Sequence, residues 1–360
     1  MTESRQITAA DVPALMRGCA LLGTGGGGEV YTGSLIALDA LERYGPVTMV
    51  TLDELPGEGL LLPLGMIGAP TVGVEKLPAG DEGSRLRDHL ERHTGRGAVA
   101  VMSSEIGGSN GLLPIAWAAE LGLPLVDADS MGRAFPEVQM VAQYVAGRPL
   151  DLIALTDACG SVVLLTPSTP EWGERVARAV CVSFGGTAAM ADYVMSVAEA
   201  RGAVVEGSVS WARAIGRAVL EADEPVAGLL EVVSGVRLID GRVVDVERRT
   251  TGGFARGSVL VEGLGHDDGR LLRLELQNEN LLALEDGAVR ASVPDLITVV
   301  DTATADAIAT EMVAYGQRVS VIAFAGDPIW RTERGLAIAG PRAFGYDFDY
   351  RPLEEIHAGA

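Results

Sequence analysis

AVAVMSSEIGGSN (98–110) and, further along the chain, LPLVDADSMGRAFPE (123–137) carry the clearest signals of the fold and of a site. Each begins with a short apolar run typical of a buried strand, and carboxylates and glycines follow each run. Enzymes of the α/β class build their sites from such residues at the ends of buried strands. The sequence therefore predicts a site at one edge of a sheet, with Glu105 and Asp129 as its first candidates.

The acidic string at 127–137 also has an ordinary structural interpretation. Asp127 and Asp129 are suitable turn and N-cap residues for a helix that follows them. Capping accounts for one aspartate, but it leaves Arg133, Glu137 and the separate Glu105 unexplained. The predicted catalytic residues are therefore Asp129, Glu105, Glu137 and Arg133.

Strand-like and helix-like stretches alternate through the first half of the chain. The expected strands are VTMVTL, AVAVM, LPLV and LDLIAL, and the expected helices include SRLRDHLERH, LLPIAWAAELG and FPEVQMVAQYVAG (135–147). Beyond about residue 167 helices come first, among them AAMADYVMSVAEA (188–200). Short strands follow, with Asp-Gly turn signals at 240–241 and 286–287.

This pattern predicts a fold that combines α/β with α+β. The N-terminal part, residues 1–166, is expected to hold a parallel or mixed sheet covered by helices, together with the glycine-rich loop and the acidic motifs. The C-terminal part, residues 167–360, is expected to be an α+β domain.

Composition excludes several classes of protein. A hydrophobic content of 48% with 21% charged residues favours a large buried core over disorder. The net charge of −21 repels phosphate backbones and anionic membranes, so we expect neither nucleic acid nor a membrane as a partner. The longest apolar run, at 60–70, is too short to span a bilayer and is broken by proline and glycine.

Cysteines and the N-terminus favour a cytoplasmic location. Cys19, Cys159 and Cys181 are widely separated, which argues against a disulfide framework, and MTESRQITAADV has no signal-peptide pattern. Cys159, where a strand meets a turn, is a candidate nucleophile without a visible base. Lys76 is the only lysine and stands far from every motif, which argues against a Schiff-base lysine. We also expect a homo-oligomer.

The glycine-rich string GTGGGGE (23–29) leaves two interpretations open. It lacks the Lys-Ser/Thr of a phosphate-binding P-loop, and a helix rather than a strand precedes it, so it does not match a dinucleotide fingerprint. It is either a helix C-cap at a close backbone crossing or a loop that lines a substrate site with its amides. The substrate-binding residues predicted from the two glycine strings are Gly25, Gly26, Gly27, Gly28, Gly107, Gly108 and Asn110.

LQNENL (276–281) places amide side chains in a strand-rich region. If the strand is continuous, Asn278 and Asn280 share one face and could hold a cyclic imide, because each amide both donates and accepts. The alternative is a polar edge strand. Among the histidines, His89 and His93 lie on a charged helix face, whereas His266 in a loop is a candidate ligand or acid–base group.

Five strings in order resemble one known family: GCALLGTGGGGE (18–29), SSEIGGSNG (103–111), DADSMGRAFPE (127–137), LQNENL (276–281) and GYDFDYRP (345–352). The chain is similar, from about residue 10 to about residue 352, to the DUF917 family, which is described as S-methyl thiohydantoin desulfurase-like. That family often neighbours hydantoinase and oxoprolinase proteins. The resemblance implies a hydrolase that removes sulfur from a small cyclic ureide, converting S-methyl thiohydantoin or thiohydantoin to hydantoin.

The candidate residues fit such a reaction. Asp129 or Glu105 would activate water, Glu137 would move the proton, and Arg133 with the loop amides would stabilise developing negative charge. Two alternatives stay open. The protein could be a non-catalytic, ligand-binding partner of a hydantoinase- or oxoprolinase-type enzyme. It could also be a metal-dependent cyclic amide hydrolase, with a divalent ion held by Glu105, Asp129, Glu137 and His266.

Overall fold

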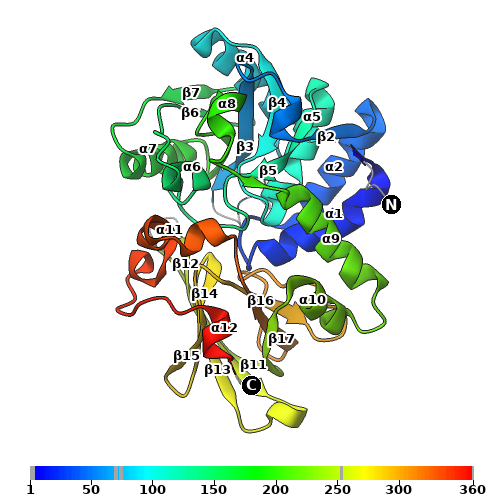
Figure 1. The fold of residues 1–360 in the computed structure, drawn as a ribbon, viewed down its shortest axis with the longest axis vertical. Helices are drawn as coiled ribbons and strands as arrows, with labels where there is room; N and C mark the ends of the chain where they lie inside the picture. Colours follow the sequence, from blue (N-terminus) through cyan, green and yellow to red (C-terminus); the bar gives the residue numbers. More distant parts are fainter. Residues whose placement is uncertain (1–4, 69–71, 73–75, 252–253, 359–360) are drawn as a thin grey trace.

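The computed structural model describes residues 5–68, 72, 76–251 and 254–358. Two sheets organise this part of the chain, and Figure 1 shows a helix-covered sheet above an antiparallel one. The predicted fold class, α/β combined with α+β, is confirmed.

The first sheet has ten strands and is mixed. Its centre holds β2, β5, β4 and β3 in parallel, as the alternating pattern predicts, and antiparallel strands extend both edges. In spatial order the strands are β1 (Gln6–Ile7), β2 (Val47–Val50), β5 (Leu125–Asp129), β4 (Ala98–Ser103), β3 (Leu60–Gly68), β8 (Thr187–Ala191), β6 (Ile153–Thr156) and β7 (Val162–Leu165), with β9 (Met195–Ser196) beside β3 and β10 (Val205–Glu206) beside β5.

The central strand β3 alternates its apolar side chains between two cores. Leu62 and Leu64 face one core, and Leu61 and Ile67 face the other. Pro63 cannot donate a ladder hydrogen bond. It lies where the neighbour of β3 changes from β9, which pairs at Leu61, to β8, which pairs from Leu64 onward. Leu60–Gly68, the described part of the apolar run at 60–70, thus supplies the middle of the sheet.

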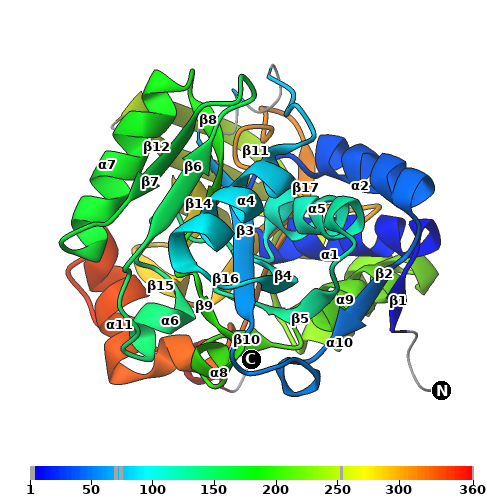
Figure 2. The ribbon, with the colours of Figure 1, turned by 90° about the horizontal axis from the view of Figure 1, so that it is seen from above.

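Helices cover both faces of this sheet. Figure 2 shows α2 and α5 on one side of β3 and α7 on the other. The helical segments of this part are η1 (Ala9–Asp11), α1 (Val12–Leu22), α2 (Val30–Tyr44), η2 (Leu52–Glu54), α4 (Glu82–Thr94), η3 (Gly108–Gly111), α5 (Leu113–Leu121), α6 (Ala142–Val145), α7 (Pro170–Ser183), α8 (Val197–Ala200), α9 (Ser208–Glu221) and α10 (Pro225–Val233).

The second sheet has seven antiparallel strands and its own apolar core. Its spatial order is β15 (Ala288–Ser292), β14 (Glu279–Glu285), β13 (Leu271–Gln277), β12 (Phe254–Gly263), β11 (Val236–Thr251), β17 (Arg318–Phe324) and β16 (Leu296–Asp301). Short helical segments complete the chain: η4 (Gly265–Asp267), η5 (Pro328–Arg331), α11 (Glu333–Ala339), η6 (Pro341–Phe344) and α12 (Leu353–Ile356).

Two expected helices are wrong over most of their length. Residues 188–200 form β8, β9 and the single turn α8, because Ala188 to Ala191 are buried along β3 and this pairing overrides their helix propensity. In the string at 135–147 only Ala142–Val145 is helical. The Glu174 carboxylate accepts the Val138 amide, and the Phe135 ring packs on Trp330, so tertiary contacts replace the expected helix near residue 136.

One of the two predicted hairpin turns is present. Asp286 and Gly287 both have positive φ and connect β14 to β15. At Asp240 and Gly241 the prediction is wrong, because β11 continues through both residues. A Cβ at Gly241 would lie 2.3 Å from the Glu262 carbonyl oxygen, so this glycine permits close strand pairing rather than a turn.

Strands β8 to β10, within 187–206, complete the first sheet. That sheet therefore takes strands from both sides of the predicted domain boundary at 166/167, which stays a prediction. What matters for the site is that β8 comes to lie directly beside β3.

Candidate active site

A cavity of about 170 Å³ lies at the carboxyl ends of the parallel strands β3 and β4. Open α/β sheets hold their ligands at this edge. In another protein, an engineered cavity of about 150 Å³ binds one benzene molecule. The cavity described here can therefore hold a single five- or six-membered ring. The wall of the cavity includes Gly27, Gly28, Glu29, Met66, Lys76, Glu105, Ser109, Asn110, Glu137, Glu174, Arg178, Asp192, Asn278 and Glu279.

Glu105, a predicted site residue, faces this cavity. Asn110 donates from Nδ2 to the Glu105 Oε1 atom at 2.5 Å, and the Met66 backbone fixes the amide by donating to Asn110 Oδ1 at 2.7 Å. The other oxygen, Oε2, is buried and has no hydrogen-bond partner among the described residues. Burial raises the pKa of Glu105 to about 8, and the Asn110 hydrogen bond opposes that rise.

Two further buried carboxyl groups, which are not among the site residues predicted from the sequence, face the cavity. Asp192 directly follows β8, and burial raises its pKa to about 7. Glu279 begins β14, and burial followed by the nearby Glu105 raises its pKa well above the usual range, while Arg133 opposes the shift. Each has a buried oxygen without a partner in the described part of the chain, Asp192 Oδ1 and Glu279 Oε2.

A signal for both residues was present in the sequence. Asp192 directly follows the apolar run AAMA, but the helix propensity of that run predicts a helix rather than a strand end at this position. Glu279 is the carboxylate within LQNENL and stands between the amide side chains of Asn278 and Asn280.

The glycine-rich loop both packs closely and lines the cavity. A Cβ at Gly26 would lie 2.1 Å from Glu279 Oε1, and one at Gly27 would lie 2.2 Å from the Gly107 carbonyl oxygen. Gly27 and Gly28 line the cavity, whereas Gly25, Gly26, Gly107 and Gly108 do not. The N-terminus of α2 is already capped, because Glu29 accepts hydrogen bonds from the amides of residues 31 and 32. The loop is therefore a close backbone crossing whose Gly27 and Gly28 line the cavity, and substrate binding by its amides stays a prediction.

Asp129 does not face the cavity. It is fully buried at the end of β5, and its carboxylate accepts the backbone amides of Ile106, Met131 and Gly132 at 2.8 to 3.0 Å. Burial raises the pKa of Asp129 to about 6 against these hydrogen bonds. Its position ties the turn that carries Glu105 to the turn after β5.

Arg133 is also fully buried and away from the cavity wall. Its guanidinium donates to the carbonyls of Ala134, Pro294 and Asp295 and to Thr24 Oγ1, at 2.7 to 3.2 Å, and it stacks on the Phe135 ring. These contacts join the loop after β5 to the start of β16 and to the end of α1. The structure does not bring Arg133 within the wall where a substrate would meet it.

The outer wall carries the remaining charges. Glu137 is partly exposed and pairs with Gln139, while Glu174 and Arg178 form an ion pair at 2.6 Å on α7. Lys76 also lines the cavity, so its expected remoteness is wrong; its Nζ donates to the Phe184 carbonyl. Lys76 is distant from the motifs along the sequence, but the fold brings it to the cavity wall, and sequence spacing does not predict that.

The strand expected through LQNENL is broken at Asn278, which has φ of 58°. Gln277 pairs with Glu279, so Asn278 and Asn280 do not share the face of one strand. Asn278 lines the cavity, but its Oδ1 accepts the Ala255 amide. Asn280 is buried outside the wall and donates to the carbonyls of Thr24 and Ile297.

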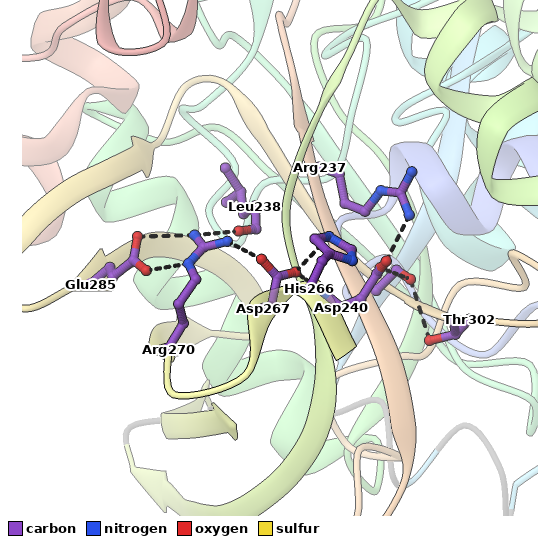
Figure 3. A network of polar contacts seen from close by, with 9 residues as sticks. Arg237, Leu238, Asp240, His266, Asp267, Arg270, Glu285 and Thr302 are labelled. Carbon is purple, nitrogen blue, oxygen red and sulfur yellow. Dashed lines mark hydrogen bonds and ion pairs between the residues drawn. The ribbon is translucent and has the colours of Figure 1, made fainter. Parts of the chain in front are cut away.

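His266 lies outside the cavity, in η4 between β12 and β13. The predicted metal set of Glu105, Asp129, Glu137 and His266 is not brought together. Among the described residues, the three acidic or histidine groups close enough to share an ion are Asp240, His266 and Asp267. Figure 3 shows that Arg237 pairs with Asp240, and that Arg270 lies between Asp267 and Glu285. These partners make the group a structural network.

The cysteines lie outside the cavity wall. Cys19 and Cys181 are buried, and all three thiols are free. Cys159 is exposed, and its backbone amide donates to the Asp157 carboxylate. In the part of the chain that the structure describes, no helix is long and apolar enough to cross a membrane.

Comparison with known proteins supplies a family. The model of the S-Me-THD-like N-terminal domain matches residues 10–167, and that of the S-Me-THD-like C-terminal domain matches residues 168–353. No curated protein matches. An X-ray crystal structure of a protein from Chromobacterium violaceum matches with a TM-score of 0.81 at 23% identity, over 97% of this chain and 100% of that one, which shows a shared fold. The chain belongs to the S-Me-THD-like family, DUF917, whose description implies a desulfurase-like enzyme.

Proposed function

We propose that this protein hydrolyses an S-methyl thiohydantoin to hydantoin and methanethiol. One observation carries the proposal: Glu105, Asp192 and Glu279 converge on a ring-sized cavity, each with a buried oxygen that no described protein group satisfies. Paired carboxyl groups with raised pKa values are suited to moving protons near neutral pH. The family description supplies the substrate class.

The reaction balances with water as the sole co-substrate. A C–O bond forms between water and the ring carbon that bears sulfur, and the C–S bond of the resulting tetrahedral intermediate then breaks. Of the two water protons, one ends on the ring nitrogen and the other on the departing sulfur. The ring carbon becomes a carbonyl, and no oxidant or reductant is consumed.

The cavity suggests a role for each group. Glu105, in its ionised form, takes the proton from the attacking water and returns it to the methanethiolate. Asp192 or Glu279, in the protonated form, donates a proton to the ring nitrogen and recovers one from the hydroxyl group of the intermediate as the carbonyl forms. Asn110 holds Glu105 in place, and Asp129 positions the turn that carries it. In this proposal Asp129 acts through Glu105 and does not touch the substrate.

The test is release of methanethiol by the purified protein from S-methyl thiohydantoin, with hydantoin identified by mass. In water enriched in ¹⁸O, the new carbonyl should carry the label. Glu105→Gln should lower kcat/KM by about 10²-fold or more, because an amide cannot take the proton. Glu42→Gln, an exposed change of equal charge on α2, should leave the rate unchanged.

The same assay separates the alternatives. A non-catalytic partner of a hydantoinase-type enzyme would release no methanethiol on its own. A metal-dependent hydrolase would contain stoichiometric metal when purified without added ions, and a chelator would abolish its activity. Full activity of the Glu105→Gln protein would reject the role given to Glu105.

A further inference from the structure

The cavity wall carries more acidic than basic side chains. Six acidic side chains and two basic ones belong to its wall, the acidic ones being Glu29, Glu105, Glu137, Glu174, Asp192 and Glu279. Both basic groups have protein partners: Arg178 pairs with Glu174 and donates to the Pro136 carbonyl, and Lys76 donates to the Phe184 carbonyl. An anionic ligand would therefore meet an acidic wall whose cations are already engaged.

Three of the acidic groups are also engaged with the protein. Glu29 caps α2, Glu137 pairs with Gln139, and Glu174 binds both Arg178 and the Val138 amide. These three contacts leave the inner carboxyl groups as the ones open to a ligand.

The inner groups are Glu105, Asp192 and Glu279, whose exposed fractions are 8%, 3% and 2%. Each keeps one buried oxygen without a partner in the described chain. Glu105 is near enough to both others for their charges to influence one another. A buried carboxyl oxygen without a partner is costly, so a ligand that donates hydrogen bonds to it gains affinity.

We propose that the cavity binds its ring as a cation, as a planar cyclic amidinium or a protonated S-alkyl isothiourea. Such a ring donates N–H groups in its plane and carries a positive charge, so it makes charge-assisted bonds to carboxylates. The inference rests on the proposed function for the ring class and extends it to the charge state. A neutral thione or an anionic ring offers the wall no such charge.

The proposal has a chemical consequence for the reaction. Protonation of the isothiourea nitrogen withdraws electrons from the ring carbon that bears sulfur, and water attacks that carbon more readily. The S-methyl ring has a C=N nitrogen that can accept a proton from Asp192 or Glu279 and be held as a cation beside the resulting carboxylate, whereas both ring nitrogens of the thione already carry hydrogen. The site should therefore favour S-alkylated rings over thiones.

Cation binding should also release protons. A positive charge beside Glu105, Asp192 or Glu279 favours their ionised forms, so carboxyl groups that keep a proton in the empty cavity lose it when the cation binds. Affinity for the cation should rise with pH as a result. The other titratable groups of the wall are those named above, and each already has a protein partner.

The experiment compares two rings of nearly equal shape by titration calorimetry at pH 7.5. 2-Aminoimidazoline is a cation at this pH, and imidazolidin-2-one is its neutral counterpart. We expect the cation to bind at least tenfold more tightly and to release about one proton, measured by repeating the titration in buffers of different ionisation enthalpy. Glu279→Gln and Asp192→Asn should each reduce this preference, and Glu42→Gln should retain it.

Equal affinity for the two rings, or no measurable binding of the cation, overturns the proposal. A preference that persists in both amide variants, once near-ultraviolet circular dichroism shows that they are folded, overturns it as well. The methanethiol assay is read separately. Turnover without cation preference rejects only the charge state, and cation preference without turnover rejects only the proposed hydrolysis.

Discussion

At the scale of single residues, burial and the hydrogen bond from Asn110 act in opposite directions on the pKa of Glu105, the proposed base. Burial raises the pKa of Glu105 to about 8 and so favours the protonated form, which cannot take a proton from water. We expect kcat/KM to fall as pH drops through about 8, approaching tenfold per pH unit below it. A pH profile of the S-methyl thiohydantoin reaction measures this.

Asn110→Asp tests the contact itself. An aspartate at this position can still accept the Met66 amide, but it cannot donate to Glu105, and its charge disfavours ionisation nearby. The midpoint of the profile should move to higher pH by about one unit. A purely structural Asn110 would lower the melting temperature and the rate at all pH values, with the midpoint unmoved.

At the scale of elements, helices and strands are predicted correctly where the spacing of apolar residues agrees with the glycine or proline residues at the ends of the segment. Strands β4 and β5 and helices α4 and α5 follow the expected stretches, because their apolar residues repeat at the right spacing. Strand β8 was missed because AAMA has strong helix propensity, and only its partner β3 makes it a strand. Asp192 was not predicted as a site residue for the same reason, since a residue within an expected helix is not expected at a strand end.

The glycine-rich loop gives a prediction at this scale. Gly26 does not have a positive φ, so alanine fits its backbone, and the clash is with the Glu279 side chain 2.1 Å from the added Cβ. Gly26→Ala should therefore displace Glu279, lowering kcat/KM by about tenfold or more with a small loss of melting temperature.

Gly97→Ala is the matched control, because its added Cβ meets nothing within 4 Å. That variant should match the unmodified protein in rate and stability. If Gly26→Ala keeps full activity, then the position of Glu279 does not matter to the reaction, and its proposed role is wrong.

At the scale of the whole molecule, the cavity depends on two sheets meeting. Glu105 and Asp192 come from the first sheet, and Glu279 comes from the second. The sequence predicts Glu105 at a strand end but does not predict Glu279 beside it, because the two lie 174 positions apart along the chain and no local pattern records which sheet edges meet. The acidic string at 127–137 predicts catalytic roles for Asp129 and Arg133, but both side chains are buried away from the cavity and hold loops.

Arg133 is the clearest link between the two sheets, and its removal should act on stability. Its guanidinium satisfies the carbonyls of Pro294 and Asp295 and lies near the Glu279 carboxyl group. Arg133→Met leaves those acceptors buried and unpaired, at a cost of about 3–5 kcal/mol. Denaturant unfolding should show this loss, whereas Arg43→Met, which removes an exposed pair with Asp39, should cost less than about 1 kcal/mol.

Activity per folded molecule of the Arg133→Met protein, measured well below its melting temperature, should fall far less than that of the Glu105→Gln protein. A stable Arg133→Met protein with kcat/KM reduced by about 10²-fold would instead support direct action on the substrate.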